Sequence, residues 1–548
     1  MAHQKFRIGY PAPGNRILVA ERGNYALNGF QANLSHSGFQ GLTWNVHNPS
    51  YIPVLPGHGG YGMDTPGGTG RHLSTPATSI FLIDRLDAAE VGSARPELGA
   101  NVYSGSFAYC WRAAVSPKVI IPIISGWVNV AASLPGQEGP VPTSGFFSYW
   151  GQFAPAPGLF IQNTKIFING GGNVVVMHLR SYMGDTTPGL GADNRDPFGQ
   201  GCGTCSPTNI VLINNEFAWS VDELCDFYRT SHLVTWAYNA FISPLHDSII
   251  EHPGDPTNTD HGFGPLIGGD SESGQPGSVS FYRNFFAHTT GRTPAVNAQQ
   301  IAAANNLYYN AGGRPGGGNG EAIDIWSQNT TAPRIANIVG NGFVRGPEHT
   351  SSIVAVRVRS GGAQTGTVGY LAGNAVHGWT AANQAALVNS SVPSWQQSTL
   401  RSTAWPGSWG TESAGYLQWA ANPQAPTLQE WFNFVDLMDS SVGAQPAIRT
   451  SSHGRVANVF TQLRNRLNGG STSFQFVDTV EEDGGWFSVP STLIDPTNPG
   501  AHWHAPLPTG PGRDIPYTSG TFSNGLSREG RSPLEVWAIE EHWRKGGK

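Results

Sequence analysis

Histidines that could exchange protons gather in the middle of the chain, with acidic residues between them. They stand at His246, His252, His261 and His288. Because an imidazole titrates near neutral pH, such a side chain can act as a general base or acid. We interpret His246 as a candidate catalytic group, and His261 and His288 as candidate substrate-binding groups. The alternative interpretation is that all of them are solvated loop residues.

A single CxxC motif is formed by Cys202 and Cys205. A structural zinc site usually has four ligands, and no second pair of cysteines is present to complete one. The motif therefore predicts a local disulfide or two free thiols, with a metal site as the weaker alternative.

The composition limits which elements can position these groups. Only 12% of the 548 residues are charged, against about 25% in an average soluble protein. The chain contains 71 Gly and 40 Pro, but its 17 Trp, 16 Tyr and 26 Phe supply too much buriable surface for disorder. This composition favours a large, turn-rich β architecture and excludes a helical bundle.

The charge and the hydropathy exclude further function classes. The formal net charge is −6, so no basic field is present to attract nucleic acid or an anionic membrane. No apolar run approaches the roughly 20 residues of a membrane-spanning helix. The first thirty residues lack an apolar segment behind a basic start, so we expect no secretory signal.

A short apolar run followed by Asn and then by an aromatic or aliphatic residue recurs along the chain. The recurring asparagines are Asn215, Asn239, Asn284, Asn306, Asn341 and Asn374. Their two shortest intervals, 24 and 22 residues, indicate a coil of just over twenty residues, with loops inserted in the longer intervals.

This period predicts a solenoid in which one strand per coil stacks on the next as a parallel sheet. An Asn after each strand tolerates left-handed backbone angles at the bend, and stacked Asn side chains can hydrogen-bond along the column. The alternative is a β-sandwich with Asn-rich turns, whose strands would recur every 8–12 residues. The wider period favours the solenoid.

The flanking segments differ from this repeat and suggest three regions. Residues 1–55 are expected to form an arm, attachment segment or cap, residues 56–380 the solenoid, and residues 381–548 a long loop excursion with short C-terminal helices. Thr427 and Glu430 form a capping box at a helix start, and Val456 to Leu467 and Ser532 to Trp543 have helical spacing. These helices are candidates to cap the ends of the solenoid.

Several motifs, in order, resemble those of bacterial pectate lyases of the pectin lyase superfamily. They are Gly57-His-Gly-Gly-Tyr-Gly62, Val119-Ile-Ile-Pro-Ile-Ile-Ser-Gly126, Trp219-Ser-Val-Asp222-Glu-Leu-Cys-Asp226, His288-Thr-Thr-Gly-Arg292-Thr-Pro294 and Leu534-Glu535-Val-Trp537. The resemblance runs from about residue 55 to the C-terminus. It implies an all-β fold, a right-handed parallel β-helix, and cleavage of a uronan by β-elimination.

The resemblance also implies roles for individual residues. Asp222 and Asp226 match the family's DxxxD positions for calcium, Asp196 is a weaker match for a third carboxylate, and Glu223 is a candidate fourth ligand. The alternative for Asp222 and Asp226 is a structural role in turns. Arg292 matches the arginine that abstracts the proton.

Two basic positions of the family pattern are replaced. Asn297 stands where the pattern expects a second arginine, and His246 stands near the expected substrate-binding lysine. No lysine occurs between Lys165 and Lys545, so the pattern predicts weak activity on pectate itself.

Two functions follow from these observations. The first is a depolymerase that cleaves a cell-surface polysaccharide by β-elimination with calcium, in the setting of a phage tail spike. The second is a non-catalytic structural or receptor-binding virion protein, in which tryptophans such as Trp219 bind sugar. In both cases we expect a polysaccharide ligand and a homo-oligomer or other virion proteins as partners. The location would be a virion tail, or otherwise the cytoplasm or the exterior by a route without a signal peptide.

Overall fold

The computed structural model describes residues 79–494, except 98–100, 116–117, 131–144, 146, 169–173, 186–194, 201–207, 228–231, 250–260, 268–277, 299, 314–320, 326–333, 350–353, 360–367, 380, 391–395, 399–425, 440–441, 447–448 and 471–474. The expected N-terminal arm, the CxxC motif, His252 and the expected helix at 532–543 lie outside the described residues.

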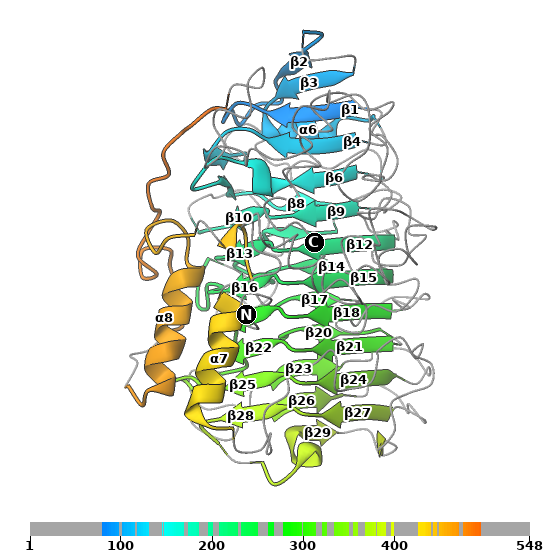
Figure 1. The fold of residues 1–548 in the computed structure, drawn as a ribbon, viewed down its shortest axis with the longest axis vertical. Helices are drawn as coiled ribbons and strands as arrows, with labels where there is room; N and C mark the ends of the chain where they lie inside the picture. Colours follow the sequence, from blue (N-terminus) through cyan, green and yellow to red (C-terminus); the bar gives the residue numbers. More distant parts are fainter. Residues whose placement is uncertain are drawn as a thin grey trace, which may run out of the picture.

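Three parallel sheets run the length of the described chain and form the solenoid (Figure 1). Sheet 1 has 13 strands, in the order β2 (Gly92–Ala94), β3 (Val102–Gly105), β1 (Ser79–Ile83), β4 (Lys118–Pro122), β6 (Phe147–Trp150), β9 (Val174–Met177), β12 (Thr208–Ile213), β15 (His232–Ala237), β18 (Ser278–Tyr282), β21 (Gln300–Ala304), β24 (Ile335–Val339), β27 (Val368–Ala372) and β30 (Gln396–Ser398). Only the pairing of β2 with β3 is antiparallel among the paired strands described.

The other two sheets receive one strand from each successive coil. Sheet 2 has nine strands, in the order β28 (Ala375–His377), β25 (Gly342–Val344), β22 (Leu307–Tyr309), β19 (Phe285–Ala287), β16 (Ala240–Ile242), β13 (Glu216–Ala218), β10 (Arg180–Tyr182), β7 (Leu159–Gln162) and β5 (Gly126–Asn129). Sheet 3 has eight, in the order β29 (Val388–Ser390), β26 (Val354–Val358), β23 (Glu321–Ile325), β20 (Ala295–Val296), β17 (Leu266–Ile267), β14 (Asp226–Phe227), β11 (Phe198–Gly199) and β8 (Ile166–Phe167). The predicted parallel β-helix is therefore confirmed.

The predicted column of asparagines is present at the bend between sheet 1 and sheet 2. The Asn215 amide donates to Oδ1 of Asn239 at 3.0 Å, and the same contact repeats from each recurring asparagine to the next, up to Asn374. Each amide also bonds a strand carbonyl, as Asn284 does with Trp236 at 2.9 Å. The column fixes the register of the coils.

The backbone angles at this bend differ from the expectation. The left-handed residue precedes each ladder asparagine: Asn214 has a φ of 55° and Tyr238 a φ of 59°. The ladder asparagine itself is not among the described residues with positive φ. Its role is to direct a buried amide into the column, and its neighbour makes the turn.

Aromatic rings stack inside the solenoid in a second column, two residues beyond the ladder. Phe241 lies 5.1 Å from Phe286 between ring centroids, with an interplanar angle of 7°, and Phe286 lies 5.0 Å from Tyr308 at the same angle. The period of the coils therefore specifies the apolar core as well as the ladder.

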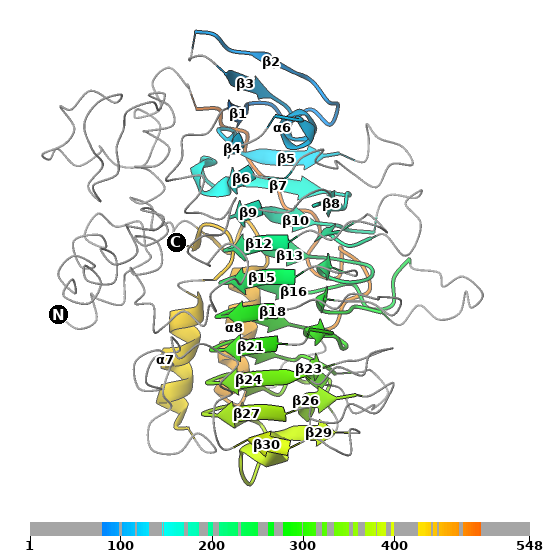
Figure 2. The same cartoon turned by 90° about the vertical axis from the view of Figure 1, so that its right-hand side faces the viewer.

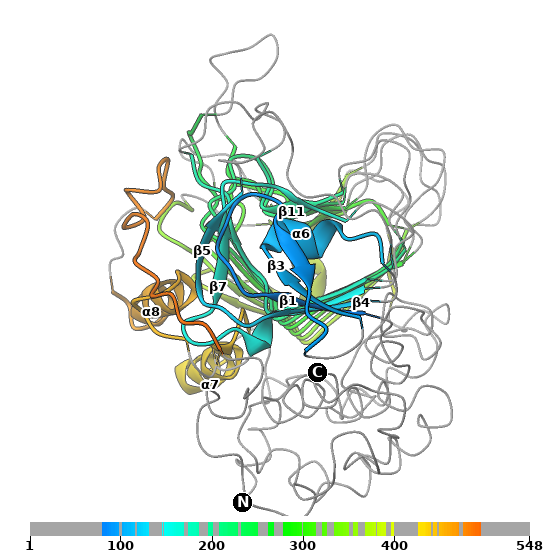
Figure 3. The ribbon, with the colours of Figure 1, turned by 90° about the horizontal axis from the view of Figure 1, so that it is seen from above.

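One end of the described solenoid is covered by a helix in the N-terminal part. Helix α6 (Phe107–Arg112) starts at Ser106, whose hydroxyl accepts from the Tyr109 amide, and it lies across the space that the three sheets enclose (Figure 3). The short 3-10 helices η2 (Gly151–Phe153) and η4 (Gln384–Leu387) lie at bends, and β29 and β30 extend the solenoid beyond residue 380.

Two of the three expected C-terminal helices lie among the described residues and form, but they lie against the side of the solenoid. Helices α7 (Leu428–Asp439) and α8 (Val456–Leu467) bury Trp431, Phe434 and Phe460 against sheet 2 (Figures 1 and 2). The capping box of α7 is confirmed, since the Thr427 amide donates to Glu430 at 2.7 Å and the Glu430 amide donates back at 3.3 Å. The outer face of sheet 2 is apolar under these helices, with Ile242, Phe285 and Leu307 among its residues, which explains why the helices cover it and not an end.

Residues 475–494 then run back along sheet 2 toward the first coils (Figure 1). The amide of Ile494 donates to the Ile123 carbonyl at 2.8 Å. No helix among the described residues is long and apolar enough to cross a bilayer.

Candidate functional site

Charged side chains gather at the turns that lead into sheet 3. We call them the acidic cluster and define it as Lys165, Asp196, Asp222, Glu223, Asp226 and Arg292. Lys165 precedes β8 and Asp226 begins β14, so stacked coils bring together residues that are distant in the sequence. This arrangement unites every carboxylate predicted as a calcium ligand.

Lys165 lies inside the cluster and contacts two of its carboxylates. Its ammonium donates to Oδ2 of Asp196 at 2.5 Å and to Oδ2 of Asp226 at 3.3 Å. The lysine side chain is 3% exposed. Burial alone would lower the pKa of Lys165, but the two carboxylates raise it above its ordinary value, so the side chain is a fixed cation.

Asp222 is held in an unfavourable electrostatic position. Burial raises the pKa of Asp222 well above its ordinary value, and the neighbouring Asp196 raises it further, against the lowering effect of Arg292. The Oδ1 atom of Asp196 also accepts the Glu223 amide at 2.7 Å. A positive charge beside Asp222 would stabilise its ionised form.

The carboxylates fit a hard divalent cation. Oxygens of Asp196, Asp222 and Glu223 lie within 4.8 Å of one another. Carboxylate oxygens are the ligands that calcium prefers. Four carboxylates face two cationic side chains in the acidic cluster, and the excess of negative charge equals the charge of one divalent ion.

Arg292 is the most exposed of these charged side chains. Its guanidinium pairs with Glu223 and lies 4.1 Å from the centroid of the Phe263 ring. The exposed fraction is 35% for Arg292 and 5% for Glu223. The backbone approaches closely here, since a Cβ at Gly264 would lie 2.3 Å from the Arg292 carbonyl oxygen. The ring and the carboxylate therefore hold the guanidinium at the surface.

His261 lies next to the cluster. Its Nε2 is 3.5 Å from Oδ1 of Asp222, and its ring contacts Phe263 edge-on at 4.7 Å between centroids. Its side chain is only 5% exposed. The contact suits a residue that positions Asp222.

The other residues predicted for the site lie under the C-terminal segment. Trp219 is fully buried and donates from Nε1 to Asp483 at 2.7 Å, so its ring has no surface to offer a glycan. His288 is 2% exposed and contacts Gln462 of α8 at 2.9 Å. His246 lies 3.4 Å from Asp478 and stacks on Phe476. These three side chains face the layer that covers sheet 2.

Two members of the site were not predicted as such. Lys165 lies between the matched motifs and belongs to none of them, and the only available signal was its isolation in a chain with very few lysines. Phe263 lies next to the histidines and acidic residues that were predicted as candidates, and its position in the sequence gave no sign of a contact with Arg292.

Comparisons with known proteins give limited information. No family model matches the chain, and no curated protein matches it. Similar solved structures include the major cedar pollen allergen Jun a 1 (13% identity, TM-score 0.35, 70% of this chain and 92% of that one) and the thermostable pectate lyase PL 47 (15%, 0.38, 72% and 98%). Pectate lyase C from Erwinia chrysanthemi is also similar (17%, 0.31, 62% and 85%). At these scores the likeness adds nothing to the fold given by the strand pairing, and nothing about activity.

Proposed function

We propose that the chain binds an acidic polysaccharide at the acidic cluster and cleaves it by β-elimination. The observation that carries the proposal is the partly exposed guanidinium of Arg292 beside carboxylates that fit a divalent cation. A uronate presents a carboxylate beside a weakly acidic C–H bond, and both a cation and a base are needed there.

The reaction balances without a co-reactant. A base removes the proton from C5, the C–H electrons form the C4–C5 double bond, and the C4–O4 bond breaks with its electrons leaving on O4. The O4 atom then takes a proton. We assign proton abstraction to Arg292, which the Phe263 ring and Glu223 hold in place. Because a guanidinium is almost entirely protonated at neutral pH, only its minor neutral form can abstract the proton, and we expect the rate to rise with pH.

Asp196, Asp222 and Glu223 would hold a calcium ion. When bound, the ion would neutralise the substrate carboxylate and so make the C5 proton more acidic. Lys165 neutralises Asp196 and Asp226 from within the fold and is too buried to contact a glycan. His261 orients Asp222.

The test is a panel of uronate polysaccharides, such as polygalacturonate, alginate and hyaluronan, assayed with calcium and with a chelator. Cleavage gives the ultraviolet absorbance of an unsaturated uronate. Arg292→Ala should lower the rate at least about 100-fold. Arg357→Ala is the matched control, because Arg357 is 40% exposed and pairs with Glu321 at 3.0 Å on the same sheet. No absorbance on any substrate, or equal rates for wild type and Arg292→Ala, would reject the lyase proposal.

A second candidate function is binding without cleavage, in a receptor-binding or structural virion protein such as a tail spike. It is favoured by the ion pairs that both basic side chains form within the cluster: Lys165 pairs with Asp196, and Arg292 pairs with Glu223. Affinity electrophoresis in gels containing the same polysaccharides separates the two: retardation without product supports binding alone. A monomer in solution would argue against the tail-spike setting, in which we expect a homo-oligomer.

A further inference from the structure

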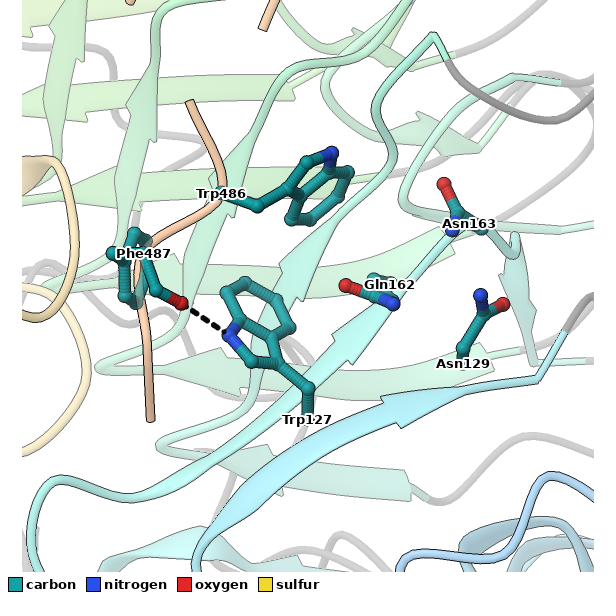
Figure 4. A pocket seen from close by; sticks show the side chains of 6 residues that line it. All are labelled: Trp127, Asn129, Gln162, Asn163, Trp486 and Phe487. Carbon is teal, nitrogen blue, oxygen red and sulfur yellow. Dashed lines mark hydrogen bonds between the residues drawn. The ribbon is translucent and has the colours of Figure 1, made fainter. Parts of the chain in front are cut away.

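A pocket of about 400 Å³ opens beside the first coils of sheet 2 (Figure 4). This volume is at the lower end of the range of about 300–1,000 Å³ that is usual for small-ligand sites. Its lining residues are Trp127, Asn129, Gln162, Asn163, Trp486 and Phe487. All six are uncharged, in contrast to the acidic cluster.

Aromatic side chains form one side of the pocket. The rings of Trp127 and Trp486 lie 5.1 Å apart between centroids and nearly perpendicular, at 85°. Trp127 donates from Nε1 to the Phe487 carbonyl at 2.9 Å, which fixes its indole (Figure 4). Rigid indole rings provide apolar surface at little entropic cost, which suits the C–H face of a sugar.

Amide side chains form the other side. Gln162 and Asn163 follow each other at the end of β7, and Asn129 ends the neighbouring strand β5 (Figure 4). The Oδ1 atom of Asn129 is buried and has no hydrogen-bond partner among the described residues. A buried acceptor of this kind costs free energy until a donor reaches it. A sugar hydroxyl can donate to or accept from an amide in either orientation.

The pocket is completed by two distant parts of the chain. Trp486 comes from the segment that returns along sheet 2, and its ring lies over Gly184, where a Cβ would be 2.4 Å from Cζ2. Gly184 has a φ of 76°, so glycine suits both the backbone and the space. The absence of a side chain at Gly184 therefore leaves the space that the Trp486 indole occupies.

We propose that this pocket binds an uncharged sugar ring of a polysaccharide. The aromatic rings match the apolar C–H face of a neutral pyranose, and the amide groups can hydrogen-bond its hydroxyls. The lining residues carry no formal charge, as suits an uncharged ligand. A uronate would bring a carboxylate to a site whose described lining residues include no cation. The site therefore differs in its ligand class from the acidic cluster, and it does not depend on cleavage.

The pocket and the cluster share one turn of the chain. Asn163 follows β7, and Lys165 stands two positions later, before β8.

Isothermal titration calorimetry with neutral tetrasaccharides of glucose, galactose and mannose tests this proposal. We expect at least one to bind the full chain with a Kd of about 1 mM. Trp486→Ala should weaken that binding at least tenfold, and Asn129→Ala severalfold, with unfolding temperatures showing that both variants are folded. Trp379→Ala is the matched control, since Trp379 is also partly buried but does not line the pocket.

The outcomes separate this proposal from the proposed lyase function. Arg292→Ala should leave neutral-sugar binding unchanged, so the pocket can be confirmed even if no uronan is cleaved. The proposal is overturned if no neutral tetrasaccharide binds. It is also overturned if Trp486→Ala and Asn129→Ala bind as wild type does, or if the pocket takes only an apolar probe such as indole.

Discussion

The ammonium nitrogen of Lys165 lies 2.5 Å from Oδ2 of Asp196, and both side chains are almost completely buried. Asp226 accepts from the same ammonium at 3.3 Å. A lysine thus holds two of the carboxylates that the sequence motifs had suggested for a metal. A divalent cation bound in addition to the Lys165 ammonium would be held by Asp222 and Glu223 together with Asp196.

Removing Lys165 is expected to destabilise the protein strongly. Lys165→Met leaves two buried carboxylates without their cation, which costs about 3–5 kcal/mol in the free energy of unfolding. Chemical denaturation measures the loss. Lys118→Met is the control, because the ammonium of buried Lys118 donates to neutral carbonyls, among them Trp111 O at 2.7 Å, and forms no ion pair with a carboxylate among the described residues. Its loss should be smaller, and Lys165→Met with Asp226→Asn should recover part of the stability. Equal losses for the two lysines would contradict this assignment.

Neutralising Asp222 should separate stability from cation binding. Asp222→Asn removes the repulsion between two buried carboxylates, so the protein without calcium should gain about 1 kcal/mol. We expect calcium to raise the unfolding temperature of the wild type, and this rise should be absent in Asp222→Asn. Asp436→Asn, at an exposed ion pair with Arg464, should retain the rise. A calcium effect of the same size in Asp222→Asn would show that the ion binds elsewhere.

A substitution in the middle of the asparagine column should lower the stability of the protein. Asn284→Ala leaves the Trp236 carbonyl and the Asn239 amide without their partners inside the fold, at a cost of about 3 kcal/mol or more. Thermal unfolding measures the loss. Asn383→Ala removes an exposed cap of η4 and should cost about 1 kcal/mol or less. Similar losses at both positions would mean that the column contributes little.

Acid should destabilise the protein through buried histidines. Burial lowers the pKa of His349 to about 4, and its Nδ1 accepts the Gly346 amide while Nε2 contacts the Ala311 carbonyl. Because the unfolded state takes up the proton first, the stabilising contribution is complete above about pH 6.5 and is lost as pH falls toward 4. The loss is on the order of 3 kcal/mol.

A comparison of wild type and His349→Gln between pH 7.5 and pH 4.5 measures this contribution. Glutamine can replace both hydrogen bonds without titrating. The variant should therefore lose less stability on acidification than the wild type. Parallel pH profiles for the two proteins would show that His349 is not the group responsible.

Much of the fold could be predicted because its signals recur locally. Asn239, Asn284 and Asn306 each follow a short apolar run, and the structure places them in one column. The capping box at Thr427 likewise needs only neighbouring residues. Where α7 and α8 pack could not be predicted, since it depends on the apolar outer face of sheet 2, which only forms when the coils stack.

The site was predictable only in part. Asp222, Glu223 and Asp226 stand close together in the sequence and remain together in the structure. Lys165 is 31 residues from Asp196 and 61 from Asp226, so no local pattern joins them. Trp219 shows the reverse case, since its aromatic type suggested a sugar contact while the returning C-terminal segment buries it.

Successive asparagines of the column are separated by as few as 22 and as many as 45 residues, yet their amide contacts are alike at 3.0 Å. The column thus keeps its geometry whatever length of chain leaves and returns between two coils. Insertions and deletions can lengthen or shorten a coil without shifting its neighbours. Surface loops can therefore change in length and sequence while the interior stays constant. A change in the ligand proposed here would therefore require no new fold, only a loop of different sequence or length between two coils.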